Sequence, residues 1–350
     1  MENTNNQNIY CVSLSKNGKT TSLAATETNG IPDMVKTNFI SWVDIVTDEI
    51  EKTANKISPE LGFSKDFLLK VFSNDKPRYE DFDSELAIII PSITVSGFIV
   101  KLNSLYILVK ENLVLTIHSK EVQRFVRLRR YGKVMLGKLN PKHKAEDNLS
   151  LLFIRLIDEN NDRNFDYLKE IQEHSDSISS KLADPKFSRT QISKEIHKMK
   201  HALISYLSGL WITVDVLNSF KYGDAKLFTD DEVILGKFGN VVDSVSHQIS
   251  LAEHLSAVLS SGFEVLQSIY NNQLQILNNR IALLMAYLTI VGTAVLVPNT
   301  LATALSGTIF NLGPKDANWY IILLVASTII STVLAYVIVK RAGLLPERPE

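Results

Sequence analysis

The sequence predicts an α/β N-terminal cytoplasmic domain, followed by a long helical stalk and two C-terminal transmembrane helices. Two observations near the C-terminus indicate this fold class: no residue from Ile281 to Pro314 is charged, and none from Trp319 to Val339 is charged. Each run is long enough to cross a bilayer, which takes ~20 apolar residues. The third observation is a stripe of apolar residues at helical spacing upstream of the first run. It predicts one unbroken helix from about residue 233 into the membrane.

Short segments rich in β-branched and aromatic residues alternate with helical ones between residues 9 and 135. The expected strands are Ile9–Leu14, Phe39–Ile45, Leu86–Ser92, Phe98–Asn103, Leu105–Lys110 and Leu113–His118. The expected helices are Val46–Ile57, Lys65–Phe72 and Val122–Tyr131. The sequence contains no glycine-rich phosphate loop, nucleophile elbow or metalloprotease motif, so we do not expect an enzyme.

Two further helices are expected before the stalk. One covers about Lys144–Leu182, with the charged stretch DENNDRNFDYLKE on a solvated face, and the other covers about Arg189–Ser219. The expected organisation is then a tail (1–8), an α/β domain (9–140), a helical pair (141–232), the stalk continuing into the first span (233–310), an outer loop (311–318), the second span (319–340) and a final tail (341–350).

Charge and cysteine content limit the partners and the compartment. The formal net charge is -1, which gives no support for nucleic-acid binding. The single cysteine, Cys11, cannot form an internal disulfide, so a reduced compartment is expected. Arg280 precedes the first span and Lys340 and Arg341 follow the second, whereas the loop between them carries only Lys315 and one acid. This distribution predicts that both termini lie in the cytoplasm and that the protein lies in the cell membrane.

One face of the first span carries polar residues. Steps of three and four place these residues together: Thr289, Thr293, Val297, Thr300 and Ala304. Two helices cannot enclose a pore, so a conducting protein of this kind must assemble from several copies around an axis. Leu296 and Val297 are then candidates for an apolar gate, and Pro298 for a kink. The alternative for each threonine is a hydrogen bond to its own helix backbone.

Several segments in order resemble the CorA family of magnesium channels over nearly the whole chain. They include SLYILVKENLVLTIHS, YNNQLQILNNRIALLMAYLTI and VPNTLATALSG, the last of which is similar to the Met-Pro-x-Thr-x-Ile-x-Gly segment of that family. The resemblance implies a funnel-shaped homopentamer in the lipid bilayer and a central pore lined by the first span. It also implies transport of divalent cations, Mg²⁺ first, with regulatory Mg²⁺ bound between subunits.

The outer mouth departs from the family pattern. The Gly-Met-Asn signature is expected at Gly307, Thr308 and Ile309, where only the glycine remains, and Asn311 is a candidate replacement for the asparagine. Magnesium keeps several of its waters, which an asparagine ring can hold and Ile309 cannot. Two alternatives therefore stay open. One is a CorA-like transporter of another metal ion (Zn²⁺, Co²⁺ or Ni²⁺), and the other is a membrane-anchored sensor or scaffold that has lost its pore.

Three weaker signals complete the candidate sites. Asp243 and Glu253 of the stalk are candidates for regulatory metal binding between subunits, with solvation as the alternative. His197 and His201 are four residues apart and form either a metal-binding pair or two surface histidines. Lys340 and Arg341 form a basic group at the inner mouth, with topology determination and lipid contact as the alternative.

Overall fold

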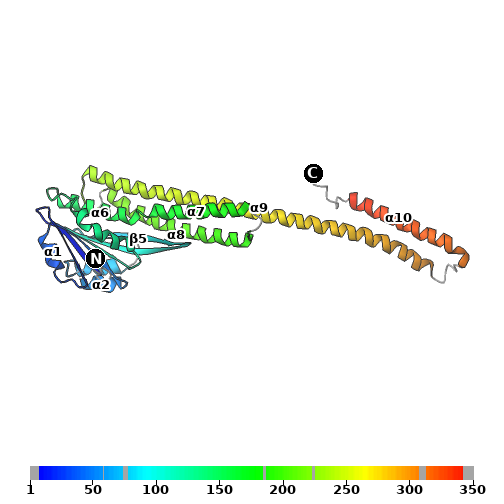
Figure 1. Ribbon diagram of the computed structural model, residues 1–350, viewed down its shortest axis with the longest axis horizontal. Helices are drawn as coiled ribbons and strands as arrows, with labels where there is room; N and C mark the ends of the chain where they lie inside the picture. Colours follow the sequence, from blue (N-terminus) through cyan, green and yellow to red (C-terminus); the bar gives the residue numbers. More distant parts are fainter. Residues whose placement is uncertain are drawn as a thin grey trace. The chain divides into compact units, whose positions relative to one another are not determined.

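The computed structural model describes residues 8–57, 59–73, 78–183, 187–222, 225–306 and 313–341 (Figure 1). The chain forms two compact units, Met1–Phe263 and Glu264–Glu350, and each is described by itself. The first unit contains the sheet and nearly all the helices. The second contains the last part of one long helix and a final helix. The expected fold class, an α/β domain followed by a long helix and apolar C-terminal helices, is confirmed.

The first unit is built on a seven-stranded sheet in the order β2-β1-β3-β7-β6-β5-β4. Its strands are β1 (Ile9–Leu14), β2 (Thr20–Ala25), β3 (Ile40–Val46), β4 (Arg78–Asp81), β5 (Glu85–Ser96), β6 (Ile99–Lys110) and β7 (Leu113–His118). All neighbouring strands are antiparallel except β3 and β7, which pair in parallel with Val43 opposite Leu115.

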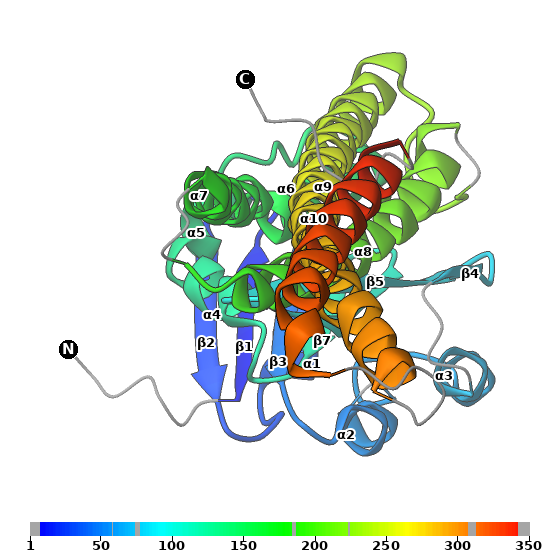
Figure 2. The same cartoon turned by 90° about the vertical axis from the view of Figure 1, so that its right-hand side faces the viewer.

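Helices cover both faces of this sheet. In Figures 1 and 2, α2 (Ile50–Ile57) and α3 (Lys65–Phe72) lie on one side of it and α6 (Ala145–Asn161) and α8 (Arg189–Lys221) on the other. Side chains of α1 (Ile31–Thr37), α2 and α3 share one core with the inward residues of β1, β3, β5, β6 and β7. Because both faces are covered, every residue of β1, β3 and β7 is buried, and most of their side chains are apolar.

The sheet differs from the sequence prediction at its edges. β1 and β7 have the expected bounds, but β2 and β4 were not expected, and the two expected strands from Phe98 to Lys110 form the single strand β6. β5 and β6 form a hairpin of two 12-residue strands. Gly97 lies in the turn with φ 59°, a conformation that favours glycine. β2 is an edge strand of small and polar residues, which lacks the apolar signal on which the prediction depended.

The expected single helix over Lys144–Leu182 is wrong. It is broken into α6 and α7 (Asn164–Ala183), which are separated by Asp162 and Arg163. The expected solvated face is also wrong at the break, because Asn160, Asn161 and Asn164 are buried. Asparagine favours helix ends, where its side chain replaces backbone hydrogen bonds. Three asparagines within five residues are typical of a helix end and coincide with the break.

Three helices of the first unit meet in an aromatic cluster. Phe153 of α6, Phe220 of α8, Phe228 of the following loop and Phe238 of α9 (Glu232–Leu305) have ring centroids 4.9–6.2 Å apart. The helix α8 is long and apolar enough to cross a membrane, but half of its apolar stretch is buried in this unit. Gly209 lets α8 approach β5 and β6 closely, so α8 is a core helix.

Short helices connect β7 to this helical layer. They are α4 (Gln123–Leu128), the 3₁₀ turn η2 (Arg129–Tyr131) and α5 (Gly132–Leu136). Their side chains include two buried or half-buried arginines, Arg124 and Arg129, that reach into the interior of the unit.

Candidate ion pathway

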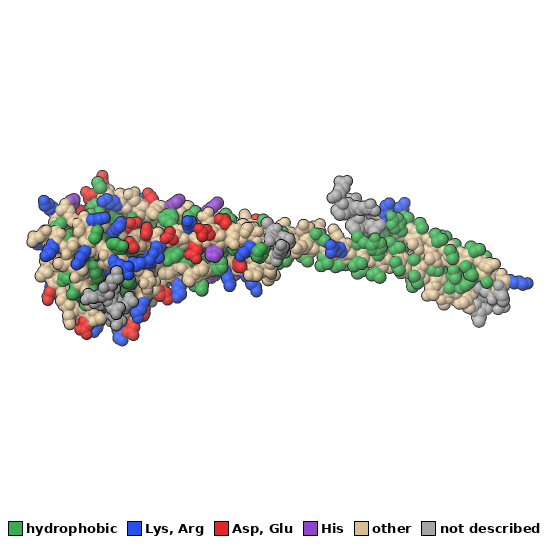
Figure 3. Space-filling view, viewed as in Figure 1, with side chains coloured by type: hydrophobic (Ala, Val, Ile, Leu, Met, Phe, Trp, Pro, Cys, Tyr) green, Lys and Arg blue, Asp and Glu red, His purple; other side chains and the backbone are tan. Residues whose placement is uncertain are grey.

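The second unit contains the two long stretches that lack charged residues. After Phe263, α9 continues to Leu305, and after the 3₁₀ turn η3 (Pro314–Asp316) the helix α10 (Ala317–Arg341) begins. Both helices are long and apolar enough to cross a membrane, and little of either apolar stretch is buried. Figure 3 shows apolar side chains covering this unit, whereas charged side chains concentrate on the first unit. Such a surface is stable only in a lipid environment or against other copies.

Few side chains of α9 and α10 are buried within the second unit. Ala286 of α9 and Ser331, Ala335 and Val339 of α10 are buried. The hydroxyl of Tyr320 donates to the carbonyl of Ala302 at 3.5 Å.

The threonines of α9 bond to their own helix. The hydroxyls of Thr289, Thr293 and Thr300 donate to the carbonyls of Met285, Thr289 and Leu296 at 2.9, 2.7 and 2.7 Å. Thr289 and Thr300 are exposed and Thr293 is half-buried, so α10 leaves most of this face uncovered. Ala304 is exposed and completes the face. The expected face is therefore accessible in the second unit.

These backbone bonds determine what each hydroxyl offers to a ligand. A hydroxyl has one donor and two acceptor lone pairs. Because the donor is already used, the part of each threonine oxygen that faces away from the helix is an acceptor only. The waters around a cation turn their hydrogens outward, so they need acceptors. A row of such threonines thus fits a hydrated cation and offers no donor to an anion.

The candidate gate residues are also accessible. Leu296 is 67% exposed and Val297 is 37% exposed. The helix α9 continues through Pro298 to Leu305. Proline lacks an amide hydrogen, so the carbonyl four residues earlier loses its helical partner. This carbonyl belongs to Ala294, which is half-buried.

The outer-mouth residues Gly307, Thr308, Ile309 and Asn311 lie outside the described residues. Beyond them, the Asp316 carboxylate accepts a hydrogen bond from the backbone amide of Gly313 at 3.0 Å. This bond fixes the turn that precedes α10. At the other end of α10, Lys340 and Arg341 are exposed and form its last turn.

The structure does not bring Asp243 and Glu253 together, and within the described part of the chain it gives the pair His197 and His201 of α8 no third ligand. Asp243 and Glu253 are exposed on α9 and lie ten residues apart, which is about 15 Å along a helix. His197 and His201 are exposed on α8 beside Lys198, whose charge repels a cation. Among the described residues, no three His, Cys, Asp or Glu side chains lie close enough to hold a metal.

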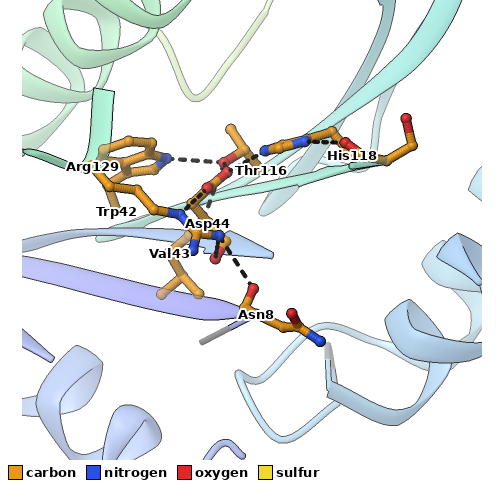
Figure 4. Close-up of polar contacts among 8 residues, drawn as sticks. Asn8, Trp42, Val43, Asp44, Thr116, His118 and Arg129 are labelled. Carbon is orange, nitrogen blue, oxygen red and sulfur yellow. Dashed lines mark hydrogen bonds and ion pairs between the residues drawn. The ribbon is translucent and has the colours of Figure 1, made fainter. Parts of the chain in front are cut away.

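A buried ionic cluster in the first unit has a structural role (Figure 4). The Asp44 carboxylate lies 2.6 Å from Arg129 Nε and 3.2 Å from His118 Nε2, and it accepts a hydrogen bond from Thr116 at 2.5 Å. Trp42 Nε1 donates to the same threonine at 3.0 Å. Burial alone would raise the pKa of Asp44, but His118, Arg129 and Thr116 outweigh burial and lower it to about 2.

A sheet domain whose last helix, α9, continues as an apolar stretch of membrane-spanning length, followed by a second such helix, α10, has the architecture of a membrane protein. The chain belongs to the family described as CorA-like Mg²⁺ transporter protein, whose model matches residues 38–341. No curated protein matches the chain by sequence.

Solved structures share the fold. The complete CorA magnesium transporter from Methanocaldococcus jannaschii is 20% identical with a TM-score of 0.70, covering 96% of this chain and 98% of its own. Full-length CmaX is 16% identical with a TM-score of 0.64, covering 95% and 96%. The ZntB cytoplasmic domain from Vibrio parahaemolyticus is 11% identical with a TM-score of 0.55, covering 75% and 98%. The resemblance to the CorA family is confirmed.

Proposed function

We propose that this protein is a homopentameric Mg²⁺ channel of the cell membrane with both termini in the cytoplasm and no enzymatic step. Membership of a Mg²⁺ transporter family supports the ion and the transport class. The long apolar stretches of α9 and α10 support the assignment of two membrane spans. The basic residues Arg280, Lys340 and Arg341 at one side of both spans support the orientation.

The observation on which the proposal depends is the acceptor row of α9. Thr289, Thr293 and Thr300 each use their hydroxyl hydrogen within the helix, at 2.7–2.9 Å. In a ring of subunits each threonine position becomes a ring of acceptors around the axis. Mg²⁺ dehydrates reluctantly and is best conducted with its waters. Such rings bind those waters without stripping them.

The apolar residues between the rings supply the gate. Val297, with Leu296 beside it, lies between Thr293 and Thr300 along the helix. A ring of these side chains expels water when it narrows and so blocks a hydrated ion without a steric plug. A small outward movement of α9 restores water and conduction.

Capture and regulation use residues at the two ends. At the outer mouth we propose that Asn311 replaces the asparagine ring that Ile309 cannot form, while Gly307 and Thr308 form the rim. On the cytoplasmic side, Asp243 and Glu253 are accessible on α9 and can bind regulatory Mg²⁺ only with a second copy. Lys340 and Arg341 contact lipid headgroups or the inner mouth.

Flux through proteoliposomes tests the proposal. Purified protein is reconstituted with a trapped magnesium indicator, and Mg²⁺ uptake is measured under an inside-negative potential. Thr300→Leu places a bulky apolar group in the proposed ring, and we expect at least a tenfold lower rate. Thr332→Leu is the matched control, because Thr332 makes the same backbone bond (2.7 Å to the carbonyl of Thr328) on α10, outside the proposed row.

The two variants separate an effect on the pore from a general effect of replacing a threonine by leucine in a membrane helix. Equal loss in both variants, or none in Thr300→Leu, removes the assignment of this face to the pore. Absence of any uptake by the wild-type protein, with Mg²⁺, Co²⁺, Ni²⁺ or Zn²⁺ outside, would refute transport itself. Native mass spectrometry of the detergent-solubilised protein checks the subunit number.

A further inference from the structure

Five buried polar side chains meet where α6 ends and α7 begins. They are Arg124, Asn161, Asn164, Tyr206 and Gln248, from α4, α6, α7, α8 and α9, and we refer to them as the Asn164 hub. Each is 6% exposed or less. Buried polar groups are costly unless they are paired, so a cluster of this size specifies an arrangement of its elements.

Asn164 is bonded to four neighbouring helices. Its side-chain oxygen accepts from both terminal nitrogens of Arg124 at 3.3 Å. Its backbone carbonyl accepts from the Tyr206 hydroxyl at 2.8 Å. Its side-chain nitrogen donates to Gln248 Oε1 at 3.1 Å and to Asn161 Oδ1 at 3.3 Å.

The charge of Arg124 fixes the direction of these bonds. Among the described residues no carboxylate forms an ion pair with Arg124, and burial lowers its pKa without removing the charge, because arginine stays protonated in proteins. A guanidinium only donates, so the oxygen of Asn164 must face it and the NH₂ group must face Gln248. Gln248 therefore presents its oxygen to Asn164 and its own NH₂ to the carbonyl of Asn161, at 3.5 Å.

Glutamine fits position 248 better than chemically similar residues would. Position 248 needs an acceptor at one end and a donor at the other, which a carboxylate cannot supply and a side-chain amide can. Shorter asparagine would not span both partners. Gln248 is thus matched to the hub at both of its ends.

The rest of the contact between α9 and the first unit is apolar. Among the described residues from Glu232 to Phe263, Gln248 is the only α9 residue whose side chain hydrogen-bonds another element. The buried residues around it are Ile234, Phe238, Val241, Val242, Val245, Ile249, Ala252, Leu255 and Leu259. Apolar contact is non-directional, so such a seam tolerates sliding and rotation of the helix.

We infer that Gln248 is a positioning residue that fixes the axial and rotational register of α9 against the sheet domain. A single buried polar residue in an apolar helix seam is the best-attested device for setting register. The same continuous helix, α9 (Glu232–Leu305), carries both Gln248 and the threonine row. The consequence for transport rests on the proposed function; the register itself does not.

Distance measurements between two electron spin labels test the register directly. Cys11 is the only cysteine, so a Cys11→Ser background accepts spin labels at Asp243→Cys on α9 and Lys169→Cys on α7, both exposed positions. Labelled subunits are diluted with unlabelled ones, so that each assembly carries one labelled copy. Gln248→Met keeps the length and volume of the side chain and removes both hydrogen bonds. Gln267→Met, at an exposed position of the same helix, is the matched control.

We expect one narrow distance distribution in the wild type and in Gln267→Met. Gln248→Met should show a second population displaced by about 1.5–5.4 Å, from one residue to one turn of helix. A neutral hydrogen bond corresponds to a factor of about 3–10 in an equilibrium constant, so we also expect a change of that size in the Mg²⁺ uptake rate. Gln248→Leu is a second variant in case the methionine packs poorly.

The two readouts distinguish the two hypotheses. Distance distributions of both Gln248 variants that superimpose on the wild type overturn the inference, whatever the flux. If the Gln248 variants show displaced distances but neither the wild type nor any variant conducts an ion, the inference about register stands and the proposed function is refuted.

Discussion

The Asp44 cluster offers a test of whether a buried ionic network stabilises the sheet domain. Asp44→Asn keeps the size of the side chain but removes the charge that Arg129 and His118 share. Arg129 is only 12% exposed, so its largely buried charge loses its carboxylate counter-charge. Breaking a buried ion pair from one side costs about 3–5 kcal/mol, and we expect a loss of this size in the free energy of unfolding.

Urea unfolding at pH 7, followed by tryptophan fluorescence, measures this loss. Trp42 is fully buried and bonded to Thr116 in the same cluster, so its emission reports on the site. Asp48→Asn is the matched control, since Asp48 forms an exposed pair with Lys120 and should leave stability unchanged. A loss below about 1 kcal/mol in Asp44→Asn would refute the reasoning, because the charge would then be compensated by water.

The same cluster predicts the pH dependence. The folded-state pKa of Asp44 is lowered to about 2, whereas an unfolded aspartate titrates near ~4. Its contribution is therefore present above about pH 4 and is lost as the pH falls from about 4 to about 2. The difference between wild type and Asp44→Asn should shrink over this range, and a difference that stays constant down to pH 2 would contradict the assignment.

Two further changes test packing and ion capture. Gly209→Ala would place a Cβ 2.8 Å from Leu102 Cδ2; overpacking of this kind costs about 1–3 kcal/mol, and urea unfolding should show it. Gly236→Ala is the control, because nothing lies within 4 Å of a Cβ built at this position. Alanine in a helix gains about 0.5–1 kcal/mol in stability over glycine. Equal effects of the two substitutions on unfolding would show that α8 does not pack as described. Ile309→Asn restores the side chain that hydrogen-bonds hydrated Mg²⁺, so it should tighten block of Mg²⁺ uptake by cobalt hexammine; unchanged block would place the ion-capture site elsewhere.

The membrane helices and the central strands were predictable because their signals are local. An uncharged run as long as Trp319–Val339 is typical of a membrane span, and α10 extends only two residues beyond it at each end. The strands β1 and β7 are mostly apolar segments bounded by polar turns, and their bounds were predicted without error. Periodicity also predicted the start of α9 within one residue.

The edges and the polar interior were not predictable from local pattern. β2 is polar, and it forms because β1 offers it a complete ladder of partners, which is a tertiary effect. The asparagines of the Asn164 hub lie in a charged stretch that is typical of a solvated face, and partners distant in the sequence, such as Arg124 and Gln248, explain their burial. The accumulation of asparagine at positions 160, 161 and 164 was the available signal for a helix end.

The threonine row shows what sequence can and cannot define. Spacing predicted that Thr289, Thr293 and Thr300 share a face, and the alternative of bonding to the helix backbone is also observed. The two interpretations are compatible, because a backbone-bonded hydroxyl keeps its acceptor lone pairs. Which way the face points depends on neighbouring copies, which a single chain does not contain.

The parallel pairing of β3 with β7 has a consequence for the order of events during synthesis. The centre of the sheet cannot close until the ribosome has made residue 118, whose strand pairs with residues 41–46. The first uncharged run begins at residue 281, which is 163 residues later (281 − 118). At about 5–20 residues per second this interval lasts roughly 8–30 s. Non-local strand pairing takes about milliseconds to seconds, so the sheet can be complete before any part of the chain enters the bilayer.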